Sequence, residues 1–303
     1  MAAPTRRHFL KTGATVAAAS AMPFQRLWAQ EEATAQQLGS NLFIVTADGV
    51  NAVAQSASNG ALLVDGGSSA TSRAVLEFVA ALPDGGPVHT LFNTHWHPEQ
   101  TGSNVELGEA GARIIAQENT RLWLTTDITY PWDETQRFDP LPKVGQPNDS
   151  FYDDGELDNG VRFGYLRHAA HTDGDLYVYF PDDNVLAVGD AVSGSGWPFV
   201  DWWTGGWIGG IVGTLELVLS LMNDDTRVVP ARGAVLGITD IQDQFRMYNE
   251  IYTRLQTMLN NGFGPEDVLE AKPTEEFDAA MGPSEFFVRR SFESLWAYLS
   301  PDA

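Results

Sequence analysis

Short strands and helices that alternate through two successive halves constrain the fold of this 303-residue chain more than any other feature. Hydrophobic periodicity and turn residues predict strands at 42–46, 52–56, 61–65, 90–93, 113–116, 161–167, 176–180, 185–188 and 227–230. The same patterns predict helices at 72–82, 119–126, 214–222, 240–259 and 284–299. Because 43% of the residues are hydrophobic, the chain can bury a substantial core. This order of elements predicts an α/β protein that opens with a β-meander.

Residues 130–151 interrupt the alternation. The stretch is rich in Pro, Asp, Asn and Gln, and its apolar residues show no period. This composition is typical of loops, and a loop of such length is usually a functional insertion or a linker. We therefore expect a long surface loop or insertion here, within a single domain at 38–303 that ends in C-terminal helices.

The first 29 residues have the features of an export signal. They contain four of the 18 basic residues and no acidic residue, with T-R-R-H-F-L-K at 5–11 and an Ala-rich run at 12–22. That run has too few residues to cross a bilayer as a stable helix, so we expect no stable membrane anchor. The heptapeptide resembles the twin-arginine signal, which implies that the twin-arginine machinery exports the folded protein to the periplasm or the medium. The alternative is an accidental arginine pair.

Acidic residues dominate the chain. It contains 40 Asp and Glu residues against 18 Lys and Arg, which gives a net charge of −22. A field of this sign repels the phosphates of nucleic acid and anionic lipid, so we expect no nucleic-acid partner. The chain has no cysteine, which excludes disulfides, thiolate metal ligands and a cysteine nucleophile. Any metal must therefore be bound by His, carboxylate or amide groups.

Three of the six histidines stand in patterns that suit one metal site. His95 and His97 in T-H-W-H-P are two residues apart, so in an extended segment their imidazoles project the same way, and we expect Pro98 to prevent a helix there. His171 follows another strand in H-A-A-H-T-D-G-D, and Asp190 ends the strand V-L-A-V-G-D. Three imidazole nitrogens and one carboxylate oxygen suit tetrahedral zinc. Because all four residues follow strands, we expect them to meet at one sheet edge.

These motifs resemble those of the metallo-β-lactamase superfamily. A β-meander ending in V-D-G-G at 64–67 is followed by the two-histidine motif, H-T-D-G-D and G-D, in the family's order and roughly its spacing. The resemblance covers about residues 42–236. It implies a four-layer αβ/βα sandwich with the site at one sheet edge. It also implies that the family's first metal site is formed here by His95, His97, His171 and Asp190.

This chain departs from the resemblance at the family's second metal site. That site normally adds the aspartate and histidine of H-x-H-x-D-H and a histidine in a P-G-H-G-like turn, where this chain has Glu99, Gln100 and Arg232. No histidine follows His171, so we predict a single zinc ion. Gln100 can offer a neutral oxygen and Glu99 a carboxylate, but these groups and a cation should bind a second ion weakly. We expect Arg232 either to pair with Glu99 or Asp190, replacing part of the missing positive charge, or to turn toward solvent.

The remaining residues near these motifs suit hydrolysis. Zinc with one open position lowers the pKa of bound water from about 15.7 to about 7. Glu99 is the candidate to orient that water or move its proton, the task that the family gives to the aspartate at this place. We expect Asp65 in V-D-G-G to hydrogen-bond a ligand or a loop and not to bind metal. The aromatic residues between Trp197 and Trp207 either form a wall of a substrate pocket or pack a loop onto the core.

We therefore expect an exported zinc hydrolase that acts on an ester, lactone, thioester or amide bond of a small molecule. Nothing particular in the sequence supports a β-lactamase role. One alternative is a non-catalytic metal-binding or partner-binding protein that kept the first site for stability, and another is a metal-free scaffold. Bound metal without chelator-sensitive turnover would distinguish the non-catalytic protein from the enzyme.

Overall fold

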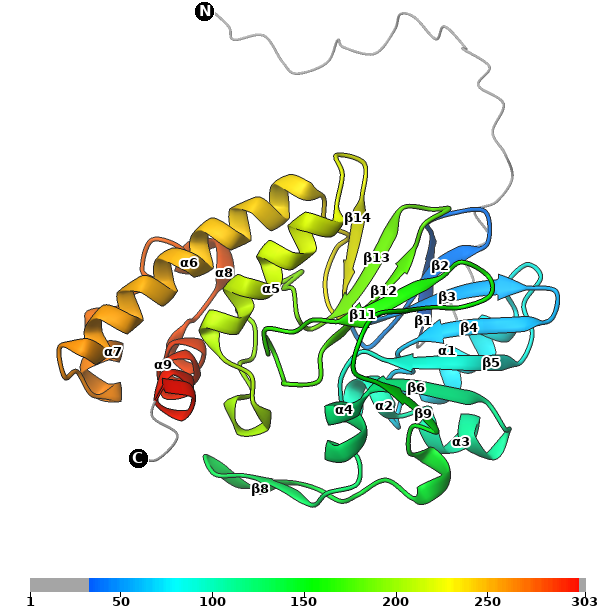
Figure 1. Ribbon diagram of the computed structural model, residues 1–303, viewed down its shortest axis with the longest axis horizontal. Coiled ribbons are helices and arrows are strands. Elements are labelled where there is room, and N and C mark those ends of the chain that lie inside the picture. Colours follow the sequence, from blue (N-terminus) through cyan, green and yellow to red (C-terminus); the bar gives the residue numbers. More distant parts are fainter. Residues whose placement is uncertain (1–32, 300–303) are drawn as a thin grey trace, which may run out of the picture.

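The computed structural model describes residues 33–299, which form four layers (Figure 1). Two β-sheets face each other at the centre, and helices cover the outer face of each sheet. This is the αβ/βα sandwich that the sequence predicted. The expected export signal at 1–29 lies outside the described residues. Within residues 33–299, no helix is both long and apolar enough to span a membrane.

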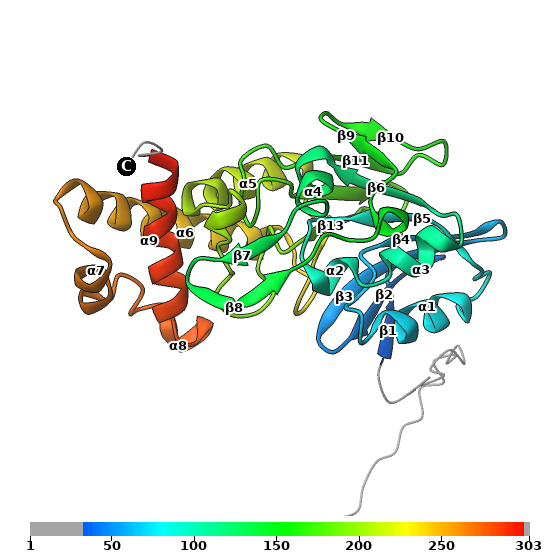
Figure 2. The same cartoon turned by 90° about the horizontal axis from the view of Figure 1, so that it is seen from below.

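The first sheet has seven strands in the order β1-β2-β3-β4-β5-β6-β9. The first four are joined as an antiparallel meander, and β4, β5, β6 and β9 are parallel. Helices α1 and α3 cover its outer face, and the short helices α2 and α4 follow β5 and β6 (Figure 2). The bounds are β1 Ala33–Gln37, β2 Leu42–Ala47, β3 Val50–Ala57, β4 Gly60–Val64, α1 Ser72–Ala80, β5 Val88–Asn93, α2 Pro98–Thr101, α3 Asn104–Glu109, β6 Arg113–Gln117, α4 Glu118–Trp123 and β9 Asp149–Phe151.

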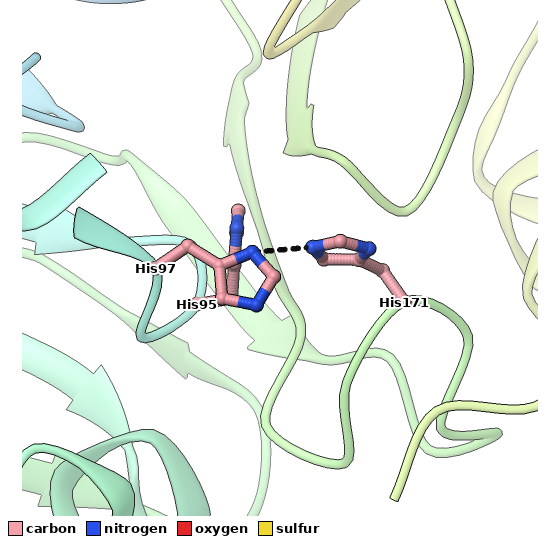
Figure 3. Close-up of side chains that lie close together, drawn as sticks. All are labelled: His95, His97 and His171. Carbon is pink, nitrogen blue, oxygen red and sulfur yellow. Dashed lines mark hydrogen bonds between the residues drawn. The ribbon is translucent and has the colours of Figure 1, made fainter. Parts of the chain in front are cut away.

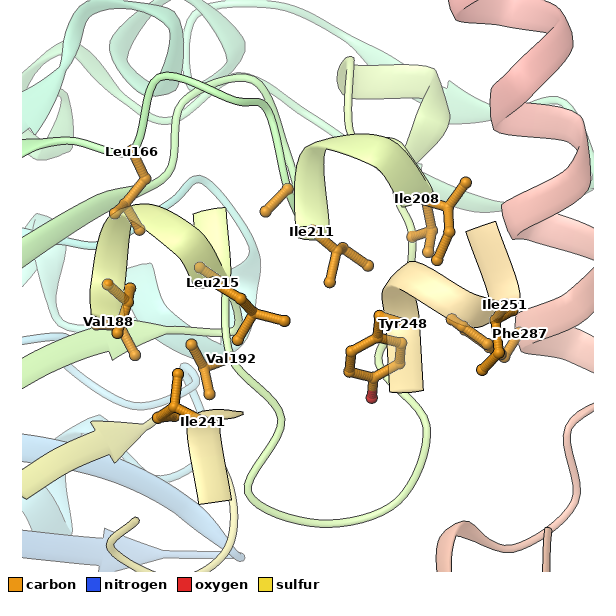
Figure 4. Close-up of a cluster of buried hydrophobic side chains, with 14 of the residues drawn as sticks. Leu166, Val188, Val192, Ile208, Ile211, Leu215, Ile241, Tyr248, Ile251 and Phe287 are labelled. Carbon is orange, nitrogen blue, oxygen red and sulfur yellow. The ribbon is translucent and has the colours of Figure 1, made fainter. Parts of the chain in front are cut away.

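The second sheet has five strands in the order β10-β11-β12-β13-β14, and only β13 and β14 are parallel. Helices α5 and α6 pack on its outer face, and α9 packs against them through the buried cluster drawn in Figure 4. The bounds are β10 Gly155–Glu156, β11 Arg162–Tyr165, β12 Leu176–Phe180, β13 Val185–Gly189, α5 Ile208–Leu221, β14 Arg227–Pro230, α6 Ile238–Asn260, α7 Pro265–Ala271, α8 Asp278–Met281 and α9 Glu285–Leu299.

The layers follow from the alternation of side chains along the central strands. In β4, Ala61 and Leu63 pack on the side of α1, whereas Leu62 and Val64 belong to the core between the two sheets. A strand that is covered on both faces is apolar at every position, which is why β4 reads G-A-L-L-V. The loops that follow β5, β11 and β13 are thereby held on a rigid frame.

Residues 130–151 were expected to form a long surface loop or insertion, and the unstructured loop is wrong, because this stretch contains regular structure. Strands β7 (Ile128–Tyr130) and β8 (Asp133–Phe138) form a hairpin, a 3₁₀ turn η1 covers Lys143–Gly145, and β9 completes the first sheet. The sequence D-E-T-Q-R-F of β8 is mostly exposed, so it lacks the apolar alternation by which a strand is recognised. The contact of β9 with β6 is only three residues long.

Two further differences concern element starts. Pro98 does not prevent a helix but begins one, because the first helical position needs no backbone donor. Strand β1 pairs with β2 and precedes residue 38, where we expected the domain to begin.

Candidate metal centre

Three histidines from two loops meet at one edge of the two sheets. His95 and His97 lie in the turn between β5 and α2, and His171 lies in the loop between β11 and β12. One nitrogen from each imidazole lies within 4.8 Å of the other two, and all three side chains are buried. Figure 3 shows the three rings directed toward a common centre. The structure therefore brings together the three histidines that the sequence singled out.

The outer nitrogens of two of these rings fix where their protons lie. His171 Nδ1 is 2.8 Å from the backbone oxygen of Phe199, and His97 Nε2 is 3.0 Å from a carboxylate oxygen of Asp201. A carbonyl or carboxylate oxygen only accepts, so these outer nitrogens carry the protons. When both rings are neutral, the inner nitrogens, His97 Nδ1 and His171 Nε2, carry lone pairs. They lie 2.9 Å apart, and a metal ion bound to both would stabilise two lone pairs that face each other at that distance.

The third imidazole completes a donor set that suits zinc. His95 is fully buried, and its Nε2 atom has no hydrogen-bond partner within residues 33–299. Burial holds the pKa of His95 well below its usual value, so this ring is neutral. Tetrahedral zinc with Zn–N bonds of about 2.0–2.1 Å spaces its ligand nitrogens about 3.3 Å apart. The inner nitrogens fit that requirement in chemistry and in approximate spacing.

Asp190 lies beside the histidines but is not a member of their cluster. Its Oδ2 atom is 3.5 Å from His95 Nε2 and accepts a 3.4 Å hydrogen bond from Gln100 Nε2. Gln100 is fully buried, and its oxygen has no partner among the described residues. It therefore turns its nitrogen, and not the expected neutral oxygen, toward Asp190.

Asp65 holds the loop that carries His95. Its Oδ1 atom accepts a 2.8 Å hydrogen bond from the backbone nitrogen of Thr94, and its Oδ2 atom lies 2.8 Å from the Thr94 hydroxyl. That hydroxyl is in turn 3.0 Å from His95 Nδ1. Burial raises the pKa of Asp65 to about 8. Asp65 thus acts on the metal centre through Thr94 and does not contact an imidazole.

A pocket of about 230 Å³ opens beside the inner nitrogens. It is lined by His97, His171, Asp190, Glu99, Arg232 and the segment at 192–199, including Trp197 and Phe199. Within residues 33–299, no ion pair within 4.0 Å joins Arg232 to either Glu99 or Asp190. Arg232 is an exposed residue. The turn that contains it is held by buried Asn51, which donates 3.0 Å hydrogen bonds to the backbone oxygens of Pro230 and Gly233.

Comparison with known proteins agrees with this geometry. A family model described as the metallo-beta-lactamase superfamily matches residues 45–236, which is more than half of the chain. The chain belongs to the metallo-beta-lactamase superfamily. Among solved structures, the DIM-1 metallo-beta-lactamase superposes with a TM-score of 0.57 at 17% identity, over 72% of this chain and 97% of that one. A metallo-beta-lactamase from Pontibacter korlensis gives 0.56 at 17% identity, over 72% and 99%.

Two curated relatives share a shorter region. The hydroxyacylglutathione hydrolase of Erythrobacter litoralis is 27% identical over 103 residues, which are 34% of this chain and 33% of the relative. The hydroxyacylglutathione hydrolase of Hyphomonas neptunium is 28% identical over 106 residues, which are 35% and 34%. The matches thus span about a third of each curated relative. At 17% identity, the structural likenesses establish the superfamily fold alone.

Both interpretations of the tryptophan-rich segment apply, to different residues. Trp197 and Phe199 line the pocket of this superfamily member. Trp202 instead donates a 3.0 Å hydrogen bond to Glu293 of α9, and Trp207 stacks on Tyr298 with ring centroids 3.8 Å apart. The same segment therefore provides a pocket wall and the contact with the C-terminal helix.

Two residues that act on the ligands were missed by the sequence analysis. Asp201 accepts from His97, and the hydroxyl of Tyr130 donates a 3.0 Å hydrogen bond to the same carboxylate oxygen. Burial would raise the pKa of Asp201, but its hydrogen bonds with His97 and Thr204 hold it below its usual value. A fully buried carboxylate thus stays charged next to the metal centre. No spacing rule indicates Asp201 or Tyr130, because both contacts arise from packing.

A third missed residue, Asp175, has a local signal. Its Oδ2 atom accepts hydrogen bonds of 2.7 and 3.0 Å from the backbone nitrogens of His171 and Thr172. An acidic side chain that closes a tight loop onto its own backbone is typical of Asp in turns. Within the H-T-D-G-D motif, Asp175 therefore holds the backbone that carries His171.

Proposed function

We propose that this protein is an exported zinc hydrolase that cleaves an ester, lactone, thioester or amide bond of a small molecule at a mononuclear site. The observation that carries the proposal is the convergence of three buried imidazoles, with the inner nitrogens of His97 and His171 2.9 Å apart and the His95 nitrogen, which has no hydrogen-bond partner among the described residues, beside them. Three buried imidazole nitrogens that face one another suit a bound metal ion. Because it opens onto a pocket, the cation can meet a substrate.

The ligand residues would be His95 through Nε2, His97 through Nδ1 and His171 through Nε2, with Asp190 as the neighbouring carboxylate. When bound there, zinc supplies hydroxide at neutral pH, because it lowers the pKa of a water molecule to about 7. The chain's own residues would hold the imidazoles in one tautomer. Asp201 does this for His97, and the carbonyl of Phe199 does it for His171.

Three side chains of the pocket would act on substrate and water. Glu99 is the candidate to orient the attacking water or accept its proton, since it lines the same pocket as the histidines. Arg232 would polarise the scissile carbonyl, because it lines the pocket and makes no ion pair within residues 33–299. Trp197 and Phe199 would exclude water on the apolar side.

A single ion is favoured by the groups at the superfamily's second position. Gln100 turns an amide nitrogen toward Asp190, and a donor at that place repels a cation. Arg232 adds a positive charge to the pocket beside it. The two partial relatives are named hydroxyacylglutathione hydrolases, so hydroxyacylglutathione should be included among the substrates tested.

The test of this proposal is a metal count followed by a substrate screen. The purified chain should contain about one zinc ion, and chromogenic esters, lactones, thioesters and β-lactams should include one whose turnover stops with chelator and returns with zinc. His171→Ala should lose both metal and turnover, whereas His168→Ala, at an exposed histidine near it in the chain, should keep both. Bound metal without chelator-sensitive turnover would support the non-catalytic alternative, and a chain that binds no metal would refute the proposal.

Export rests on the sequence at 5–11 and has its own test. A chain in which Arg6 and Arg7 are both replaced by Lys should stay in the cytoplasm of the producing bacterium, while the unaltered chain is recovered outside it. Equal export of both chains would refute the twin-arginine route.

A further inference from the structure

Helix α9 lies outside the region matched by the superfamily model, yet it packs against the hairpin β7–β8 that reaches the metal centre (Figure 2). The contact is made by Arg290 of α9, whose guanidinium carbon lies 4.4 Å from the ring centroid of Trp132 at the hairpin turn. On its own helix, the guanidinium lies 5.4 Å from the ring of Phe286 and pairs with Glu293 at 2.7 Å. The side chain of Arg290 thus joins α9 to the hairpin β7–β8, which is far from it in the sequence.

The burial of Arg290 is not explained by the stability of the fold alone. The residue is only 6% exposed, and its Nε atom has no hydrogen-bond partner within residues 33–299. This burial lowers the pKa of Arg290. A buried ion pair of this kind is often no more stable than apolar residues of the same volume. The arrangement instead fixes the orientation of the aromatic ring that it covers.

From Trp132, contacts lead directly to a metal ligand. The rings of Trp132 and Tyr130 are stacked, with centroids 4.5 Å apart and planes 19° from parallel. The hydroxyl of Tyr130 donates to Asp201 Oδ2 at 3.0 Å and lies 3.2 Å from His97 Nε2. Asp201 Oδ2 accepts from His97 Nε2 at 3.0 Å, so the outer side of this imidazole is held by both residues.

We propose that Arg290 is a positioning residue of the metal centre, which acts through Trp132, Tyr130 and Asp201 to fix the imidazole of His97. With the guanidinium in place, Trp132 keeps the hydroxyl of Tyr130 on Asp201, and the carboxylate keeps the proton of His97 on Nε2. The lone pair of Nδ1 would then be available to bind a metal ion. The C-terminal helix is thereby part of the metal site although it contributes no ligand. This inference rests on the metal-binding part of the proposed function and does not depend on the substrate.

The test measures zinc affinity by competition with a chromophoric chelator, and thermal unfolding of the metal-free chain as the measure of stability. Tyr130→Phe should weaken zinc binding about tenfold, at the lower end of the effect of groups that orient metal ligands. Arg290→Met combined with Glu293→Gln, which leaves no unpaired charge, should weaken it about three- to tenfold by the same mechanism. The matched control is Arg289→Met with Glu266→Gln, an ion pair at 2.9 Å between α9 and α7, and it should leave zinc affinity unchanged.

The decisive comparison combines the variants. If Arg290 acts through Tyr130, its replacement should weaken zinc binding by less than about twofold in the Tyr130→Phe background. The same loss in both backgrounds, or unchanged affinity in the Arg290 variant, would overturn the proposal. Should that variant unfold, Trp132→Leu interrupts the same path without altering α9, and it should give the same loss and the same lack of additivity. Zinc binding with this pattern but without any hydrolysis would sustain the inference and refute the hydrolase, whereas a chain that binds no zinc would overturn both.

Discussion

Replacing Asp201 by Asn should weaken zinc binding while the chain still folds. The Oδ2 atom of Asp201 accepts from His97 Nε2 at 3.0 Å, from the Tyr130 hydroxyl at 3.0 Å and from the Thr204 hydroxyl at 2.6 Å. Its Oδ1 atom accepts a 3.3 Å hydrogen bond from the backbone nitrogen of Thr204. An Asn oxygen can replace Oδ2, but it carries no charge, and the amide nitrogen must then face another donor at Thr204.

The magnitude follows from the charge that is lost. A carboxylate hydrogen-bonded to the outer nitrogen makes an imidazole a stronger ligand, and losing such a group costs about 10- to 100-fold in metal affinity. That corresponds to about 1.4–2.7 kcal/mol of binding free energy. Because Asp201 is fully buried, solvent cannot compensate, and we expect a loss in the middle of this range.

The assay is chelator competition for zinc, with circular dichroism to confirm folding. Asp149→Asn is the control, since Asp149 pairs with Arg113 at a partly exposed position and should not change zinc affinity. An Asp201→Asn chain that binds zinc within about twofold of the unaltered protein would refute the claim that the charge of Asp201 strengthens His97 as a metal ligand.

Three further outcomes are expected. Glu99→Gln should lower kcat about 100-fold with the zinc content unchanged, and a kcat within threefold of the unaltered enzyme would exclude a role in proton transfer. Arg232→His should raise the metal content from one ion toward two, and an unchanged count would show that the arginine is not what blocks the second position. Gly189→Ala should lower the free energy of unfolding by more than about 1–2 kcal/mol, because Gly189 has a φ of 59° and a Cβ there would lie 2.3 Å from Thr94 Oγ1. Unchanged stability in a urea titration would contradict this steric argument.

Much of the fold could be predicted because its strands are covered on both faces or alternate regularly. The apolar run of β4 and the helical repeat of α6 reflect local burial, so periodicity located them to within a few residues. Strand β8 was not predicted because it is exposed and lacks apolar alternation. Strand β9 was not predicted because its pairing with β6 depends on a segment distant in sequence. Helix α5 begins at Ile208, before the predicted residue 214, because its first turn contains two glycines that weaken the pattern.

By itself, the sequence determined which three histidines form the metal centre. The motifs T-H-W-H-P and H-T-D-G-D are local, so they can be recognised without knowledge of the rest of the fold. Only the tertiary structure decided what holds those imidazoles. Asp201 is separated from His97 by 104 positions and from Tyr130 by 71. Such pairs arise when packed layers bring loop ends together, and no local period encodes them. The covering of Trp132 by Arg290 follows the same physical rule, because a cation–π contact depends on the distance between side chains and not on their order in the chain.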